Sequence, residues 1–254
     1  RDRFTPPSMP PMEGFTQLSR LSLTLPPTAD LRFLSGVTTL SAVYLRGADD
    51  ADTLCRLDGL QDSAESLQVL SLQGTPELVS LDGMGSPPDL RVLKVSNCRK
   101  LTDLSALAGC AAIEGDDTRR HTLDLDHAGP LSDLSWLDHQ HIHALVANLD
   151  PSVDTSSIAR CKSLREVEIA VTQPGSLHLT GLESVTSLVV DLKQEPASAG
   201  PLPSLETLDV TCDTCHDLSV WPELPALDEL ILHTSSLTSL AHLKAREFRL
   251  TLKA

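Results

Sequence analysis

Cysteine and histidine residues form the most specific chemical pattern in the chain. Cys212, Cys215 and His216 make a C-x-x-C-H sequence, the spacing of covalent haem attachment. A single C-x-x-C pair is also half of a zinc site, or a redox pair. The pair follows a predicted strand, and no distal haem ligand is evident from the sequence. We therefore interpret it as a turn that contains two cysteines, with haem, zinc and redox chemistry as the alternatives.

Histidines gather in the middle of the chain, at His121, His127, His139, His141 and His143. The strand pattern described below places His121 and His143 on neighbouring strands, beside Asp124 and Asp126. Such a group could bind a transition metal or respond to pH. The simpler interpretation is that solvent-facing strand positions accept any polar residue. We therefore predict no metal and no cofactor.

Motifs that would indicate catalysis are missing. The sequence holds no nucleophile elbow, P-loop, dinucleotide fingerprint or H-E-x-x-H helix. Asp49, Asp50 and Asp52 lie too close together for a calcium loop, so they indicate a solvated surface loop. We predict a chain that is not an enzyme. An enzyme or enzyme subunit that uses the His/Asp region is the least favoured alternative.

Two spacings of apolar residues alternate along the chain, most clearly in residues 90–107, LRVLKVSNCRKLTDLSAL. The pattern L-x-x-L-x-V predicts a short strand, because residues two apart in a strand point to one face. The later spacing of three, at Leu101, Leu104 and Leu107, predicts a tight helical turn. One such unit cannot bury its apolar side alone, so it must stack on copies of itself.

The unit recurs about every 23 residues, within the range of leucine-rich repeats. Strand patterns start at Leu18, Leu40, Leu67, Leu90, Ile142, Leu164, Val185, Leu205, Leu227 and Ala245, with a weaker one at Arg120. The turn pattern recurs at Leu31/Leu34/Val37, Leu54/Leu57/Leu60, Leu78/Leu81/Met84, Leu131/Leu134/Leu137, Leu218/Trp221/Leu224 and Leu237/Leu240/Leu243.

Residues 16–254 resemble the leucine-rich repeat family. The phrases LTDLSAL, LSDLSWL and LTSLAHL are similar to the short bacterial repeats typified by internalins. The resemblance implies an α/β solenoid shaped as a horseshoe or arc. It would have about eleven short parallel strands on the concave face, and short helical, 3-10 or irregular returns on the convex face. The family's usual Asn or Cys at the ninth position is replaced in most repeats, as by Thr75, Asp150, Thr172, Asp213 and Ser235.

Length and composition favour one elongated domain. The 254 residues divide into a proline-rich linker or N-terminal cap at 1–15 and the repeat domain at 16–254. Only 3% of residues are aromatic, which suits an aliphatic core. A net charge of -15 argues against nucleic-acid and anionic-membrane binding. Three of the six cysteines, Cys98, Cys110 and Cys161, fall at inward positions, so we predict reduced thiols and a cytoplasmic protein.

The strand pattern also predicts which side chains line the concave face, and these form the candidate binding site. The first four repeats contribute basic residues and one aromatic residue, at Arg20, Tyr44, Arg46, Arg91 and Lys94. The later repeats contribute His121, Asp124, Asp126, His143, Glu166, Glu168, Asp191, Glu206, Asp209, Asp228 and Glu229, with Arg165 as the opposing charge. The concave face would thus be basic at one end and acidic at the other. We predict that it binds a protein ligand whose charges are opposite to those of each end.

These patterns predict a non-catalytic, protein-binding repeat domain. The repeats resemble those that follow the nucleotide-binding module in bacterial NLR-like (NACHT or STAND) ATPases. That resemblance implies the C-terminal, ligand-sensing region of a larger cytosolic signalling or immune-defence protein, joined to an upstream domain. The alternative is a secreted or surface adhesion module of the internalin type.

Overall fold

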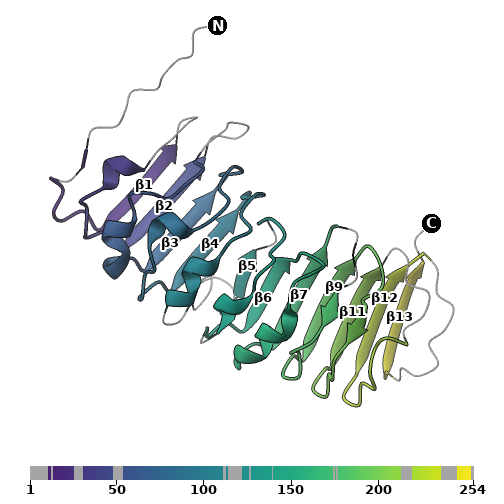
Figure 1. The fold of residues 1–254 in the computed structure, drawn as a ribbon. Helices are drawn as coiled ribbons and strands as arrows, with labels where there is room; N and C mark the ends of the chain where they lie inside the picture. Colours follow the sequence, from purple (N-terminus) through teal and green to yellow (C-terminus); the bar gives the residue numbers. More distant parts are fainter. Residues whose placement is uncertain are drawn as a thin grey trace, which may run out of the picture.

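The computed structural model describes residues 11–12, 14–25, 31–47, 54–110, 113, 122–125, 127–138, 140–173, 175, 177–212, 219–235 and 245–252. The strands stack side by side along an elongated molecule, and 3-10 turns lie on one side of them (Figure 1). Within the described residues, no helix has the length and apolar character needed to cross a membrane.

Parallel strands form two large sheets. The first sheet has four strands in the order β1-β2-β3-β4: Arg20–Leu25, Ala42–Gly47, Val69–Gln73 and Val92–Ser96. The second has seven, ordered from β13 down to β5: Thr122–Leu125 (β5), Ala144–Asn148 (β6), Glu166–Val171 (β7), Ser187–Leu192 (β9), Thr207–Cys212 (β11), Glu229–Thr234 (β12) and Glu247–Leu252 (β13). Successive strands thus pair in sequence order, as stacked repeats require.

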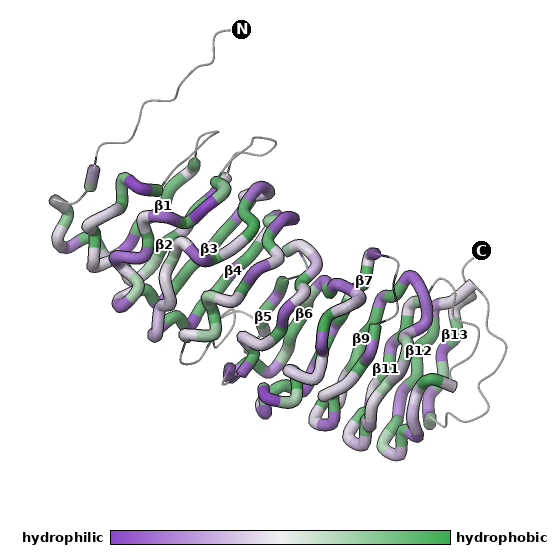
Figure 2. Tube along the Cα trace, in the orientation of Figure 1, coloured by the Kyte–Doolittle hydropathy of each residue, from purple (hydrophilic) through white to green (hydrophobic). Residues whose placement is uncertain are grey.

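The strands alternate between inward apolar and outward polar positions, and Figure 2 shows this alternation along the chain trace. The phase that the leucine spacing predicts is confirmed, because nine residues at its inward positions are each at most 7% exposed: Leu70, Leu93, Val95, Leu104, Leu145, Val167, Leu188, Leu208 and Leu230. They belong to one continuous aliphatic core that extends from β1 to β12.

The returns between strands differ along the stack. Six of them contain 3-10 helices in the part of the chain that the structure describes: Arg32–Leu34 (η1), Gln61–Ser66 (η2), Asp82–Met84 (η3), Ser105–Gly109 (η4), Ser135–Leu137 (η5) and Thr155–Arg160 (η6). In the second return, the Leu60 N–H donates to the Leu57 carbonyl at 3.1 Å, which is a turn at the predicted Leu54/Leu57/Leu60 position, and η2 follows it. All three leucines are buried. Residues 236–244, with the last predicted turn, lie outside the described residues.

Later returns are extended rather than helical. Two of them carry the short strands His178–Leu179 (β8) and Ser198–Ala199 (β10), which pair in parallel with each other. The described residues therefore hold thirteen strands, where the sequence pattern predicted about eleven. The difference arises because the pattern marks only the leucine-rich strand of each repeat, whereas β8 and β10 are extended segments that pair on the other side of the core.

An aspartate or serine starts several returns by accepting a backbone hydrogen bond two residues ahead. The Ser105 and Ser135 N–H groups donate to Asp103 and Asp133 at 2.9 and 2.8 Å. The Ser156 N–H group donates to Asp154 at 2.9 Å. Such short side chains satisfy backbone donors that the first turn leaves without a partner. The D-L-S sequence in LTDLSAL and LSDLSWL is thus a turn-forming element.

The ladder of strands is interrupted between β4 and β5, which belong to different sheets. Ten of the eleven residues from 111 to 121 lie outside the described residues, and this stretch directly precedes β5. The buried side chain of Gln140 compensates for part of the interruption. Its Oε1 accepts from the Ile113 N–H at 2.8 Å, and its Nε2 donates to the Leu107 carbonyl at 3.4 Å. The core continues across this point although the backbone ladder stops.

Cysteine residues occupy the inward positions that the repeat pattern assigned to them. Cys98, Cys110 and Cys161 are at most 4% exposed, and Cys55 is exposed. At the ninth position, the Thr75 hydroxyl and the Cys98 sulfur of the next repeat are 3.1 Å apart. The substituted ninth position therefore still links neighbouring repeats.

The predicted division of the chain into a linker or cap at residues 1–15 and a repeat domain at 16–254 stays a prediction.

Candidate recognition surface on the strand face

One face of the two large sheets points to solvent, and we call it the strand face. It consists of the outward residues of each strand and the residue directly before each strand. The strand register places neighbouring repeats in line, because Tyr44 pairs with Ser71, Ser71 with Lys94, and Val146 with Glu168. Side chains from residues far apart in sequence thus form rows across the strands.

The β1–β4 part of the strand face carries the predicted basic residues. Arg20, Arg46 and Arg91 are exposed, whereas Tyr44 and Lys94 are half-buried. The other described positions of this part are uncharged, such as Ser22, Ser71 and Gln73. This part of the face is therefore basic.

The β5–β12 part carries the predicted acidic residues. Glu166, Glu168, Asp191, Glu206 and Asp228 are exposed, and Asp124, Asp209 and Glu229 are half-buried. The opposing Arg165 donates to the carbonyls of Lys162 and Leu164, each at 2.8 Å. The sign of the charge on the strand face therefore changes at the interruption between β4 and β5. His121 and Asp126 lie outside the described residues.

Two histidines pair with acidic residues of the neighbouring strand. His143 Nε2 lies 3.6 Å from Glu166, and His233 Nε2 lies 3.9 Å from Asp209. Burial raises the pKa of the Asp209 carboxyl above its usual range, His233 counteracts this shift, and Glu229 adds to it. The Asp209 carboxylate is thus partly removed from water. His233 was not among the predicted site residues.

Arginines of the last described repeat neutralise part of the acidic surface. Arg246 lies 3.5 Å from Asp228, and Arg249 lies 3.4 Å from Glu229 and 3.8 Å from Glu247. The residues that the sequence predicted for the concave face do not include any from this repeat. The same strand positions would have revealed the arginines, because the strand pattern at Ala245 places Arg246 and Arg249 on the strand face.

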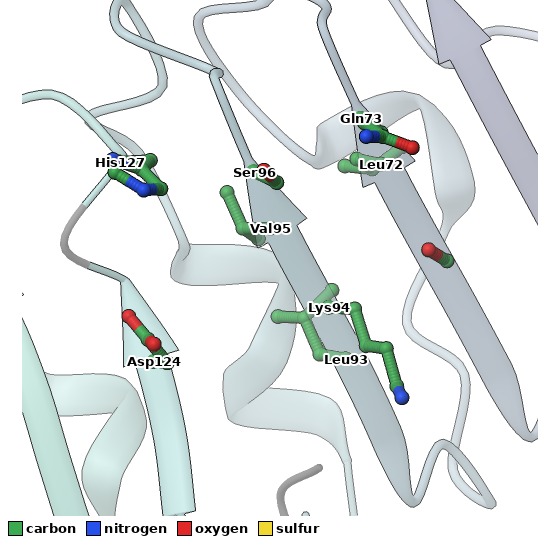
Figure 3. Close-up of a pocket in the computed structure, with 9 residues that line it drawn as sticks. Leu72, Gln73, Leu93, Lys94, Val95, Ser96, Asp124 and His127 are labelled. Carbon is green, nitrogen blue, oxygen red and sulfur yellow. The ribbon is translucent and has the colours of Figure 1, made fainter.

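A groove of about 300 Å³ opens where the charge changes sign. Lys94, Val95 and Ser96 line it from β4, and Asp124 and His127 line it from the β5 side (Figure 3). The Val92 N–H bonds to the Gln68 carbonyl on the β3 side, so the backbone groups of Leu93 and Val95 point toward β5. The segments that follow β4 and β5 are connected just beyond the strands, where the Cys98 N–H donates to the His127 carbonyl at 3.0 Å.

A second groove of about 200 Å³ crosses β5, β6, β7 and β9. Its lining includes the half-buried Val146 and Val189 together with the exposed Glu166 and Glu168. Aliphatic side chains on the solvent side of a sheet are available to a partner surface. This groove therefore combines apolar contact area with negative charge.

The candidate metal and haem sites receive no support from the described residues. These contain no group of three or more His, Cys, Asp or Glu side chains placed to hold a metal ion. Of the predicted histidine cluster, His143 pairs with Glu166, and His127 is exposed beyond β5. Cys212 is buried at the end of β11, whereas Cys215 and His216 lie outside the described residues.

Comparisons with known proteins give one structural similarity. No protein-family model matches the chain, and no curated protein matches it. The crystal structure of an internalin (inlF) from Listeria monocytogenes str. 4b F2365 is 17% identical in sequence. The similarity covers 89% of this chain and 82% of that chain, with a TM-score of 0.38. The strand register and the buried leucine positions, rather than this likeness, define the stacked-repeat architecture.

Proposed function

We propose that this chain is a non-catalytic recognition domain that binds a protein partner through the strand face. The observation that carries the proposal is the change from a basic to an acidic surface along the same face, at the interruption between β4 and β5. The inward positions maintain the core, so the outward positions can vary without loss of the fold. Complementary charge mainly accelerates association and selects partners.

The test is capture of a partner by three forms of the protein: the wild type, a strand-face variant and a control variant. The strand-face variant carries Glu166→Lys, Glu206→Lys and Asp209→Lys. The control variant carries Glu65→Lys, Glu183→Lys and Glu223→Lys, which produce the same charge change at exposed positions of the returns. We expect the strand-face variant to lose a partner that the control variant retains, and cross-links from that partner should map to the strand face. Equal loss by both variants would contradict the proposal, because it would show dependence on net charge alone.

We also propose that the domain is the C-terminal, ligand-sensing region of a larger bacterial NLR-like protein in the cytoplasm. The support is the resemblance of the repeats to those that follow the nucleotide-binding module in such proteins. A Walker A motif upstream in the same reading frame would support this context. An export signal at that place would instead support the adhesion-module alternative.

A further inference from the structure

Acidic and aliphatic side chains alternate along one row of the acidic strand face. Strand pairing connects five neighbours from β6 to β12: Val146, Glu168, Val189, Asp209 and Ile231. Val146, Val189, Asp209 and Ile231 are half-buried, and Glu168 is exposed. A partner that crosses these strands would therefore meet aliphatic and acidic groups in strict alternation, one per strand.

The spacing of this row selects the conformation of the partner. Neighbouring strands lie about 4.8 Å apart. A helix presents one residue per turn to a flat surface, at intervals of about 5.4 Å, so it falls out of step by only about 0.6 Å per strand. An extended chain presents residues on one face every 6.8 Å or so, and it falls out of step by about 2 Å per strand. Only the helix stays in register over all five strands.

From this match we propose that the row Val146–Glu168–Val189–Asp209–Ile231 is the docking site of an amphipathic α-helix that crosses the strands. Its contact face carries aliphatic and basic residues at alternate turns. The inference rests on the proposed protein-binding function and specifies the partner. Leucine or a similar residue would contact Val146, Val189 and Ile231, and lysine or arginine would lie over Glu168 and Asp209. The groove formed by Val146, Glu168 and Val189 receives one end of the helix.

The adjoining residues limit the site on the β13 side. On the β13 side, the row continues with Arg249, which pairs with Glu229 and Glu247 and would repel a basic side chain. In the β1–β4 sheet, the equivalent row reads Ser22, Tyr44, Ser71 and Lys94 and shows no such alternation. On the β5 side, the row continues with Asp124, which pairs with Val146 and extends the alternation by one position. The part of the helix over β6 to β12 corresponds to four to five turns, or about 16 residues.

Three synthetic peptides test the proposal by titration against the complete chain. The first peptide is helical and carries leucine at i, i+7 and i+14 and lysine at i+4 and i+11, which lie on one face. The second has the same composition but moves both lysines to the opposite face, at i+2 and i+9. The third is the first peptide with a central proline, which disrupts the helix. We expect the first to bind about tenfold more tightly than either of the others.

Matched single substitutions test the site on the protein. Glu168→Gln and Val189→Thr should each weaken binding of the first peptide by about threefold or more, because each removes one of the five contacts. Glu183→Gln and Val79→Thr are the controls, since both residues are exposed and lie outside the strands. The controls should change the affinity by less than about twofold. Circular dichroism of each variant verifies that the fold is kept.

Each contrary result excludes a part of the inference. Equal binding of the first and second peptides would show that binding depends on charge attraction alone and not on the pattern of the helix face. Equal binding of the proline peptide would indicate an extended partner. If no peptide binds while the strand-face variant still loses its captured partner, the helix inference is wrong and the proposed function stands. If the partner is captured equally by all three protein forms, the proposed function itself is contradicted.

Discussion

The Oδ1 atom of Asp103 accepts a hydrogen bond of 2.9 Å from the Ser105 N–H, and its Oδ2 accepts one of 3.0 Å from the Ser80 hydroxyl. The first bond starts the return at Ser105–Gly109, and the second connects that return to the preceding repeat. A single carboxylate thus forms the local turn and links two repeats.

Asp103→Ala should therefore lower the free energy of unfolding by about 0.5–2 kcal/mol, as expected for the loss of a helix cap. Urea unfolding measures the change. Asp89→Ala is the control, because Asp89 is exposed and lies in a turn between η3 and β4. Equal losses for the two variants would show that the hydrogen bonds of Asp103 contribute nothing specific.

The pH dependence of the Asp103 contribution follows from its pKa. Burial raises the pKa of this carboxyl, but hydrogen bonds from Ser105 and Ser80 outweigh burial and lower it below 3.8. The ionised group therefore stabilises the fold fully at pH values above 3.8, and this contribution is lost as the pH falls through the lower, folded-state pKa. The stability difference between wild type and Asp103→Ala should be constant from pH 7 to 5 and decrease only in strong acid.

Asp209 should show the opposite behaviour, since its folded-state pKa is raised above 3.8 by burial. Its ionisation disfavours the folded state, so this group stabilises the fold least at neutral pH. Asp209→Asn should raise the melting temperature at pH 7, and the gain should shrink as the pH falls toward 4. Thermal unfolding across this range is the measurement. A gain that does not change with pH would contradict the role of ionisation.

Leu93 and Lys94 are adjacent on β4 but face opposite sides. Leu93 is 1% exposed, whereas Lys94 is half-buried on the strand face. Leu93→Ala should destabilise the protein by about 2–5 kcal/mol through lost transfer energy and a cavity. Lys94→Ala should cost much less. Chemical denaturation of both variants gives the comparison, and equal costs would indicate a strand shifted by one residue.

Cysteine reactivity should follow burial. Cys55 is exposed, whereas Cys98 and Cys161 are fully buried, and burial raises the pKa of the Cys110 thiol to about 11. We expect iodoacetamide at pH 8 to modify Cys55 in the native protein, and Cys98, Cys110 and Cys161 only after denaturation. Mass spectrometry of native and denatured samples identifies the modified sites. Rapid native labelling of Cys98 would mean that the core opens at that repeat.

The sequence predicted the core of this protein because leucine spacing is a local property. Residues two apart in a strand and three apart in a tight turn share a face in any stacked repeat. The inward phase of Leu93, Leu145 and Leu208 was therefore readable from the sequence, and so was the outward position of Glu166 or Lys94. The polarity of the strand face followed from the same rule.

Only the tertiary structure decided what happens between repeats. β4 and β5 belong to different sheets, and Gln140 supplies bonds to residues that are 27 and 33 positions earlier. The pairing of β8 with β10 lacks a leucine pattern and arises from stacking. The alternation of Val146, Glu168 and Val189 likewise cannot be predicted from the sequence, because it depends on the register that pairs these residues across neighbouring strands. Contacts of this kind join distant residues, and local spacing carries no information about them.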